Sequence, residues 1–215
     1  MPTSRLLAVT AALLLAGCSS VYYGAMEKIG VPKRQILVDR VEAARGSQQE
    51  AKQQFASALE EFLAVTKVPA TELSATYERL NTEFKRSEDR AQEVRDRIAA
   101  IDDVAQALFR EWETELGQYT NAALRSQSAR QLAATRQRYA ALMRVMEQAA
   151  ARMAPVLDAF RDQVLFLKHN LNAQAVAALG ETNRTLQGDI SRLIADMEKS
   201  IREADSFLAT LKTEG

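Results

Sequence analysis

The sequence predicts an all-α protein, an elongated antiparallel helical bundle or coiled coil of three to four long helices. Apolar residues recur at alternating steps of three and four over most of the chain, which keeps them on one face of a helix. The 215 residues include only 8 glycines and 4 prolines, so few turns are expected. No segment alternates with the period of two that is typical of a half-buried strand.

The first predicted helix begins at Gln35 and is ended by Pro69, because proline cannot continue a helix. Thr71 is the predicted N-cap of the next helix. The apolar stripe has one polar interruption, at Gln48. Its members are Leu37, Val41, Ala44, Gln48, Ala51, Phe55, Ala58, Phe62 and Val65.

The second predicted helix covers about residues 72–116, and its stripe is sustained for more than five heptads, which is typical of coiled-coil packing. Only Ser87 interrupts it. Gly117 and the polar residues up to Asn121 form the predicted turn that follows. The stripe consists of Leu73, Tyr77, Leu80, Phe84, Ser87, Ala91, Val94, Ile98, Ile101, Ala105, Leu108 and Trp112.

The third predicted helix begins near Ser126 or Ser128. Two consecutive steps of four, through Met153 to Leu157, shift the phase of the stripe, and Pro155 lies inside this shift. We therefore expect a kink at residues 151–155. Its stripe is Leu132, Thr135, Tyr139, Leu142, Met146, Ala149, Met153, Leu157, Phe160, Val164, Leu167 and Leu171.

Gly180 and Asn183 mark a predicted break before the last helix, because both residue types are favoured at helix ends. The stripe of this helix is Leu186, Ile190, Leu193, Met197, Ile201, Ala204, Leu208 and Leu211.

The first 18 residues have the organisation of a secretory signal. Arg5 follows the amino terminus, and residues 6–16 form an apolar run of eleven. This run is too short to cross a bilayer as a helix, which needs about 20 residues, but it suits a signal peptide. The 18-residue segment ends in Leu15, Ala16, Gly17 and Cys18, and Cys18 is the only cysteine of the chain.

These four residues resemble the lipobox of bacterial lipoproteins. The resemblance implies cleavage before Cys18, transfer of a diacylglycerol to its thiol, and acylation of the new amino group, for example with palmitate. The alternative is a plain signal peptide with an incidental cysteine. Ser19 and Ser20 follow the cysteine, and the same resemblance then favours the outer membrane, facing the periplasm, over the inner membrane.

The predicted organisation is therefore a signal peptide at 1–17, a lipid anchor and tether at 18–34, and a single helical coiled-coil domain at 35–215. Cleavage leaves 198 of the 215 residues. Tyr22 and Tyr23 in the tether either sit at the lipid headgroup level, where tyrosine is enriched, or pack on the helical body.

Composition argues against several functions. The 28 basic and 28 acidic residues balance, so no basic face for nucleic acid is expected. Lipidation of Cys18 leaves no thiol for a disulfide, a zinc site or a nucleophile. Neither a glycine-rich phosphate-binding motif nor a GxSxG motif is present. The sequence predicts a non-enzyme with no cofactor and no metal.

Two polar clusters have alternative interpretations. Glu111, Glu113 and Glu115 are spaced by two and do not share a helix face, so we expect a solvated flank around Trp112 and not a chelating set. His169, the only histidine, is interpreted as part of a polar helix end. The alternatives are a buried residue that specifies register or a sensor of envelope pH.

Three stretches carry a resemblance to a known family: YYGAMEKIGVPKRQILVDRVEAAR, ALFREWETELGQYTNAALR and PVLDAFRDQVLFLKHNLNAQA. Together they resemble a family of bacterial, mainly proteobacterial, coiled-coil lipoproteins of unknown function. The resemblance covers nearly the whole mature chain and implies no activity, substrate or catalytic residue.

The first hypothesis for function is a lipid-anchored structural or interaction protein of the cell envelope. Its partners would be the membrane, through the chains on Cys18, and either a second copy or another envelope protein. The alternative is a periplasmic carrier or chaperone that binds lipid or unfolded outer-membrane proteins along an opened apolar seam.

Overall fold

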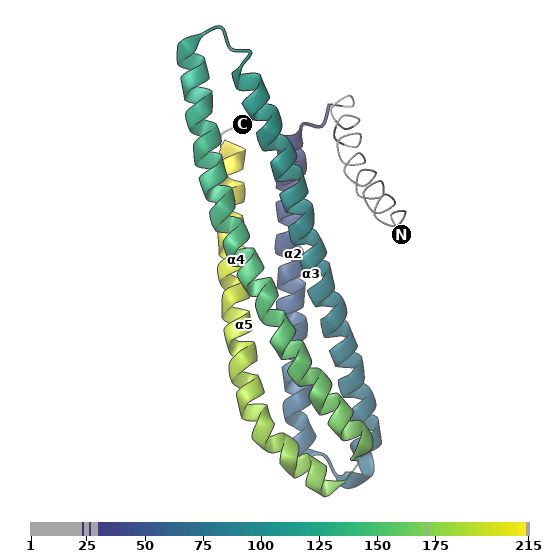
Figure 1. Cartoon of the computed structure of the whole chain (residues 1–215). Coiled ribbons are helices and arrows are strands. Elements are labelled where there is room, and N and C mark those ends of the chain that lie inside the picture. The colour runs from purple at the N-terminus through teal and green to yellow at the C-terminus, as the bar shows by residue number, and fades with distance from the viewer. Residues whose placement is uncertain (1–22, 24–25, 27–29, 171, 214–215) are drawn as a thin grey trace, which may run out of the picture. The chain divides into compact units, whose positions relative to one another are not determined.

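A computed structural model describes Tyr23, Met26, residues 30–170 and residues 172–213 of the chain. Four long helices account for most of it, and the described residues contain no strand (Figure 1). The all-α bundle predicted from the stripes is confirmed. The helices are α2 (Lys33–Ala64), α3 (Leu73–Leu116), α4 (Ala122–His169) and α5 (Ala173–Thr213), with short 3-10 helices η1 (Val65–Lys67) and η2 (Ala70–Glu72) between α2 and α3.

The described residues form two compact units. The first contains the chain up to Arg40 and Ala99–Gln137, and the second contains Val41–Ile98 and the chain from Arg138 onward. Helices α2, α3 and α4 each contribute residues to both units, whereas α5 belongs to the second unit alone.

In the second unit, ion pairs fix the direction and register of the helices. Arg45 and Lys52 of α2 pair with Asp205 and Glu198 of α5, at 2.7 and 3.4 Å. Residue numbers rise on one helix as they fall on the other, so the two helices are antiparallel. The pairs Arg90–Glu50 and Arg79–Glu61 show the same antiparallel relation for α2 with α3, and the pair Arg161–Glu88 joins α3 to α4.

The core of the second unit is centred on three stacked phenylalanines from two helices. The rings of Phe62 and Phe160 lie 4.3 Å apart at 14°, and the ring of Phe55 stacks with that of Phe160 at 6.2 Å and 16°. All three side chains are fully buried. Each aromatic side chain removes a large apolar area from water, so this cluster is a major source of stability for the unit.

The predicted stripes form the core. Every predicted stripe residue of α2 is buried, including Gln48, and so is every described stripe residue of α4. Tyr77 and Trp112 on α3 are only half-buried. On α5 the prediction is wrong at one step, because Ser200 is fully buried and Ile201 is half-exposed. The step from Met197 is three and not four, which places a serine inside and an isoleucine at the edge.

Two predicted helix starts are wrong. Thr71 is not an N-cap but lies within η2, and α3 begins at Leu73. Helix α4 begins at Ala122, ahead of Ser126 and Ser128, because the Asn121 side-chain oxygen accepts hydrogen bonds from the backbone N–H groups of residues 123 and 124. The asparagine caps the helix that the serines were expected to start.

The break predicted at Gly180 and Asn183 is also wrong, since both residues lie inside α5. The chain turns earlier, between His169 and Ala173. Asn183 is buried, and its amide nitrogen donates a hydrogen bond to the Phe62 carbonyl oxygen at 3.2 Å. Phe62 belongs to the last turn of α2, whose carbonyl groups lack hydrogen-bond partners within the helix. Asn183 therefore supplies a hydrogen bond to the end of α2 and does not end α5.

Helix α4 runs without interruption through Pro155. The proline therefore does not divide the third predicted helix, and the change of direction expected at residues 151–155 stays a prediction.

The phenylalanine cluster yields a stability prediction. Phe160→Ala should lower the free energy of unfolding by about 3–5 kcal/mol, because it leaves a cavity between Phe55 and Phe62. Phe166→Ala, six residues further along α4 at a side chain that is 40% exposed, should lower it by less than about 1 kcal/mol. Urea unfolding followed by the helical circular dichroism signal measures both. Equal losses would show that the cluster is not the centre of the core.

Candidate functional site

The predicted lipidation site lies outside the described residues. This holds for Leu15, Ala16, Gly17 and Cys18, and for the signal peptide as a whole. The nearest described residue is Tyr23, five positions after Cys18. Tyr23 and the helices that contact it are therefore the described part of the protein next to the site.

Tyr23 is helical and buried in the first unit. Its hydroxyl donates a short hydrogen bond of 2.6 Å to a carboxylate oxygen of Asp103 on α3. A charged acceptor makes such a bond about twice as strong as a neutral one. Of the two alternatives left open for the tyrosines, Tyr23 therefore packs on the helical body and does not present its ring to a lipid surface.

A turn at Gly30 precedes α2. Gly30 has φ +84°, a left-handed conformation that favours glycine, and the Val31 N–H donates to the Met26 carbonyl oxygen at 3.0 Å. Directly after the turn, Lys33 forms an ion pair of 3.1 Å with Glu111 of α3. The Lys33 side chain is only 11% exposed, so water screens this pair less than an ordinary surface pair. Two contacts to α3 thus hold the segment that follows the predicted anchor.

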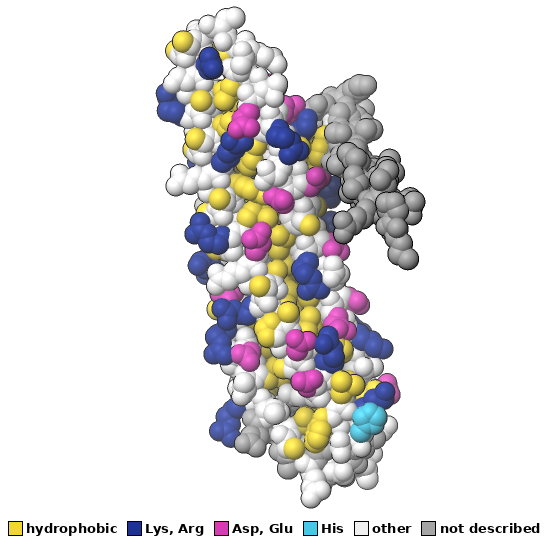
Figure 2. Space-filling model, viewed as in Figure 1, with side chains coloured by type: hydrophobic (Ala, Val, Ile, Leu, Met, Phe, Trp, Pro, Cys, Tyr) yellow, Lys and Arg dark blue, Asp and Glu magenta, His cyan; other side chains and the backbone are white. Residues whose placement is uncertain are grey.

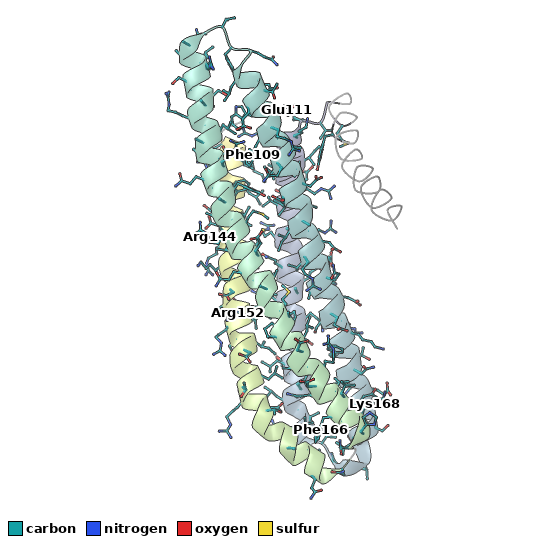
Figure 3. All side chains as sticks on the ribbon, viewed as in Figure 1. Phe109, Glu111, Arg144, Arg152, Phe166 and Lys168 are labelled. Atoms are coloured by element: carbon teal, nitrogen blue, oxygen red, sulfur yellow. The ribbon has the colours of Figure 1, made fainter. Side chains whose placement is uncertain are left out.

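The glutamates around Trp112 point to different partners. Glu111 binds Lys33 from α2, whereas Glu113 binds Arg136 from α4 at 2.6 Å. The guanidinium of Arg136 lowers the pKa of the Glu113 carboxyl, mainly by donating a hydrogen bond to it. Figure 3 shows Glu111 on α3 near Phe109, over whose ring Arg136 also lies, at 5.2 Å. These two carboxylates therefore link α3 to α2 and to α4 through ion pairs.

Trp112 also links α3 to α4, through the N–H group of its indole ring. Its ring nitrogen donates a hydrogen bond of 2.7 Å to the Ser128 hydroxyl on α4. Sequence reasoning placed Trp112 on the stripe and Ser128 at a helix start. The pairing was missed because it joins residues of two helices whose register only the fold defines.

The residues described here hold no cluster of three or more histidine, cysteine or acidic side chains suited to a metal ion. Within the same residues, no helix is both long and apolar enough to span a membrane.

His169 is the last residue of α4 and is exposed, as the histidine in Figure 2 also shows. The interpretation as a polar helix end is confirmed, and the alternative of a buried register residue is wrong. Nearby, Phe166 and Leu179 line a shallow groove of about 290 Å³ between α4 and α5, together with Asp162, Gln163, Ala178 and Thr182. Figure 3 labels Phe166 and Lys168 at this end of α4.

A polar layer crosses the core of the second unit. Gln48 and Ser200 are both fully buried, and neither amide atom of Gln48 nor the Ser200 hydroxyl has a hydrogen-bond partner among the residues that the structure describes. The ion pairs Arg45–Asp205 and Lys52–Glu198 lie on either side of them, so the two residues occupy the same level of α2 and α5. An unpaired buried polar group costs roughly 1–3 kcal/mol, so this layer lowers the stability of the core.

One family model matches the chain, over residues 22–211, and its description is Protein of unknown function (DUF2959). The chain belongs to this family. No curated protein and no solved structure matches it. Membership agrees with the resemblance at its coarser level, a family of unknown function, and says nothing of bacterial origin or of lipidation.

The polar layer gives a prediction with a matched control. Gln48→Met should raise the free energy of unfolding by about 1–3 kcal/mol, because it removes an unpaired amide and keeps a similar volume. Gln54→Met, six residues away on the same helix, should lower it by about 1–2 kcal/mol, because the Gln54 amide donates a 2.6 Å bond to the Glu83 carboxylate. Urea unfolding measures both variants. A loss of stability in both would show that Gln48 is satisfied in solution.

Proposed function

We propose that the protein is a lipid-anchored component of the cell envelope with a structural or protein-interaction role, and that it is not an enzyme. The single observation that carries the proposal is the sequence Leu15-Ala16-Gly17-Cys18 after an apolar run of eleven residues. By resemblance to bacterial lipoproteins, Cys18 would carry a diacylglycerol and acyl chains. Two or more chains give stable membrane attachment, since each buried methylene contributes about 0.8 kcal/mol. The proposed location is the outer membrane, on the periplasmic side.

The attachment of the following segment to the first unit supports this function. Tyr23 is bonded to Asp103 and Lys33 to Glu111, so a membrane anchor on Cys18 would be coupled to the helices through few residues.

The exterior of the second unit supports a binding role over catalysis. Its helices carry basic and acidic side chains in alternation, many of them paired between helices, and Figure 2 shows both signs dispersed over the visible face. Exposed ion pairs contribute at most about 1 kcal/mol each, so they are easily exchanged for contacts with a partner. The partner proposed is another envelope protein or a second copy.

The alternative, a carrier or chaperone that opens along an apolar seam, has less support. The stripe residues of the second unit are packed against one another, and Phe55, Phe62 and Phe160 would have to separate to expose them. The groove beside Phe166 is the one described feature that favours it. Binding of a hydrophobic dye to the folded protein, abolished by Phe166→Gln, would support the alternative.

The anchor is tested by Cys18→Ala. We expect the wild-type chain in the membrane pellet of lysed cells and the variant in the soluble fraction, because the acyl chains supply the attachment. Ser19→Ala, at the next residue, is the matched control and should stay in the pellet. Mass spectrometry of the amino-terminal peptide of the wild-type chain would show the mass of the lipid. A Cys18→Ala variant that still sediments with membranes would contradict the anchor.

A further inference from the structure

The end of the α3–α4 hairpin differs from the rest of the first unit. Residues 117–124, named here the hairpin tip, are all exposed. Four large hydrophobic side chains are exposed among the described residues, and two of them, Tyr119 at 41% and Leu124 at 52%, are in the tip. Apolar exposure of this kind, gathered on one protruding turn, is typical of an interaction surface.

The tip also lacks charge. No residue from 116 to 124 is charged, in a chain of which 26% is charged. Bringing a charged side chain into a low-dielectric environment is expensive, whereas amide and hydroxyl side chains cost far less. The tip is therefore suited to an environment that is less polar than water.

Local hydrogen bonds hold the tip in place. At the end of α3 the N–H groups of Gly117 and Gln118 donate to the carbonyl oxygens of Thr114 and Glu115, at 3.1 and 2.9 Å. At the start of α4 Asn121 caps the helix, and the Trp112–Ser128 bond closes the hairpin beneath the tip. These bonds brace the hairpin that carries Tyr119 and Leu124.

The length of chain between Cys18 and Tyr23 brings this surface near the proposed anchor. Five residues span at most about 18 Å when fully extended, and Tyr23 is fixed to Asp103. The tip begins after Leu116, thirteen residues further along α3, or about 20 Å. A planar surface that holds the acyl chains is thus within reach of the tip when the hairpin lies obliquely to it.

A lipid surface fits the shape and charge of the tip. A convex turn cannot enclose a small ligand, but a fluid bilayer accepts it, and tyrosine is enriched at the headgroup level. Arg125 and Arg130 are exposed beside the tip, and α4 has no acidic residue in its first turn. On α3, Glu113 is paired with Arg136, while Glu115 is exposed.

We propose that the hairpin tip is a second membrane contact, in which Tyr119 and Leu124 insert at the headgroup level of the bilayer that holds the chains on Cys18. Arg125 and Arg130 then face anionic headgroups. This inference rests on the proposed lipid anchor. With two contacts, the first unit is oriented on the membrane instead of swinging on a single tether.

The test places one fluorescent reporter in the tip. Trp112 is the only tryptophan, so Trp112→Phe combined with Tyr119→Trp gives a chain with a single tryptophan in the tip. Trp112→Phe combined with Phe166→Trp places it at another exposed aromatic position, as the matched control. Both acylated full chains are mixed with vesicles of phosphatidylethanolamine and phosphatidylglycerol that carry brominated acyl chains, which quench tryptophan on contact.

We expect at least twofold quenching at position 119, little at position 166, and a severalfold loss of quenching at position 119 when Leu124→Gln is added. Circular dichroism verifies that each chain is folded. Equal quenching at the two positions, or none at position 119, would overturn the lipid contact and leave a protein partner as the occupant of the tip.

Flotation of the same vesicles separates failure of the tip from failure of the anchor. If acylated chains float but position 119 is not quenched, the tip proposal fails and the anchor stands. If the chain is not acylated and does not float at low lipid, yet position 119 is quenched at high lipid, the anchor fails and the tip contact stands.

Discussion

The structure of the second unit depends on the burial of aligned apolar stripes, above all where Phe55, Phe62 and Phe160 stack. Burying one large apolar side chain contributes about 1.5–3 kcal/mol, whereas an exposed ion pair contributes at most about 1 kcal/mol. Burial therefore holds the helices together, and pairs such as Arg45–Asp205 select the register in which they meet. The charged exterior and the polar layer at Gln48 are tolerated because large apolar side chains fill most of the interior.

Much of this fold was predictable because helix periodicity is a local property. The whole stripe of the first predicted helix was identified correctly. Gln48 was included in it because its position in the repeat was weighted more than its polar character. On α5 the opposite choice placed Ile201 inside, and the structure places Ser200 there. Asn183 was misjudged for a different reason. Its side chain satisfies a carbonyl of α2, and a preference measured for helix ends does not include partners from distant parts of the chain.

The candidate site was predictable only in part. The lipobox at residues 15–18 can be identified in the sequence because the signal is linear, and it remains a prediction here. The contacts that join the following segment to the first unit, Tyr23–Asp103 and Lys33–Glu111, connect residues about 80 positions apart. No local pattern indicates such pairs. Residues 116–124 carry no charge, but their exposure on a braced turn follows only from the fold.

The helices of one chain bury each other's stripes, with α2 and α5 antiparallel in the observed register. Crosslinking by a short bis-maleimide tests this arrangement in a chain that carries Arg45→Cys and Asp205→Cys together with Cys18→Ala. We expect fast crosslinking within one chain, and slow crosslinking for Arg45→Cys with Glu198→Cys, which lies two turns or about 10 Å out of register. Crosslinked dimers as the main product, or equal rates for the two pairs, would show that the stripes are buried in another way.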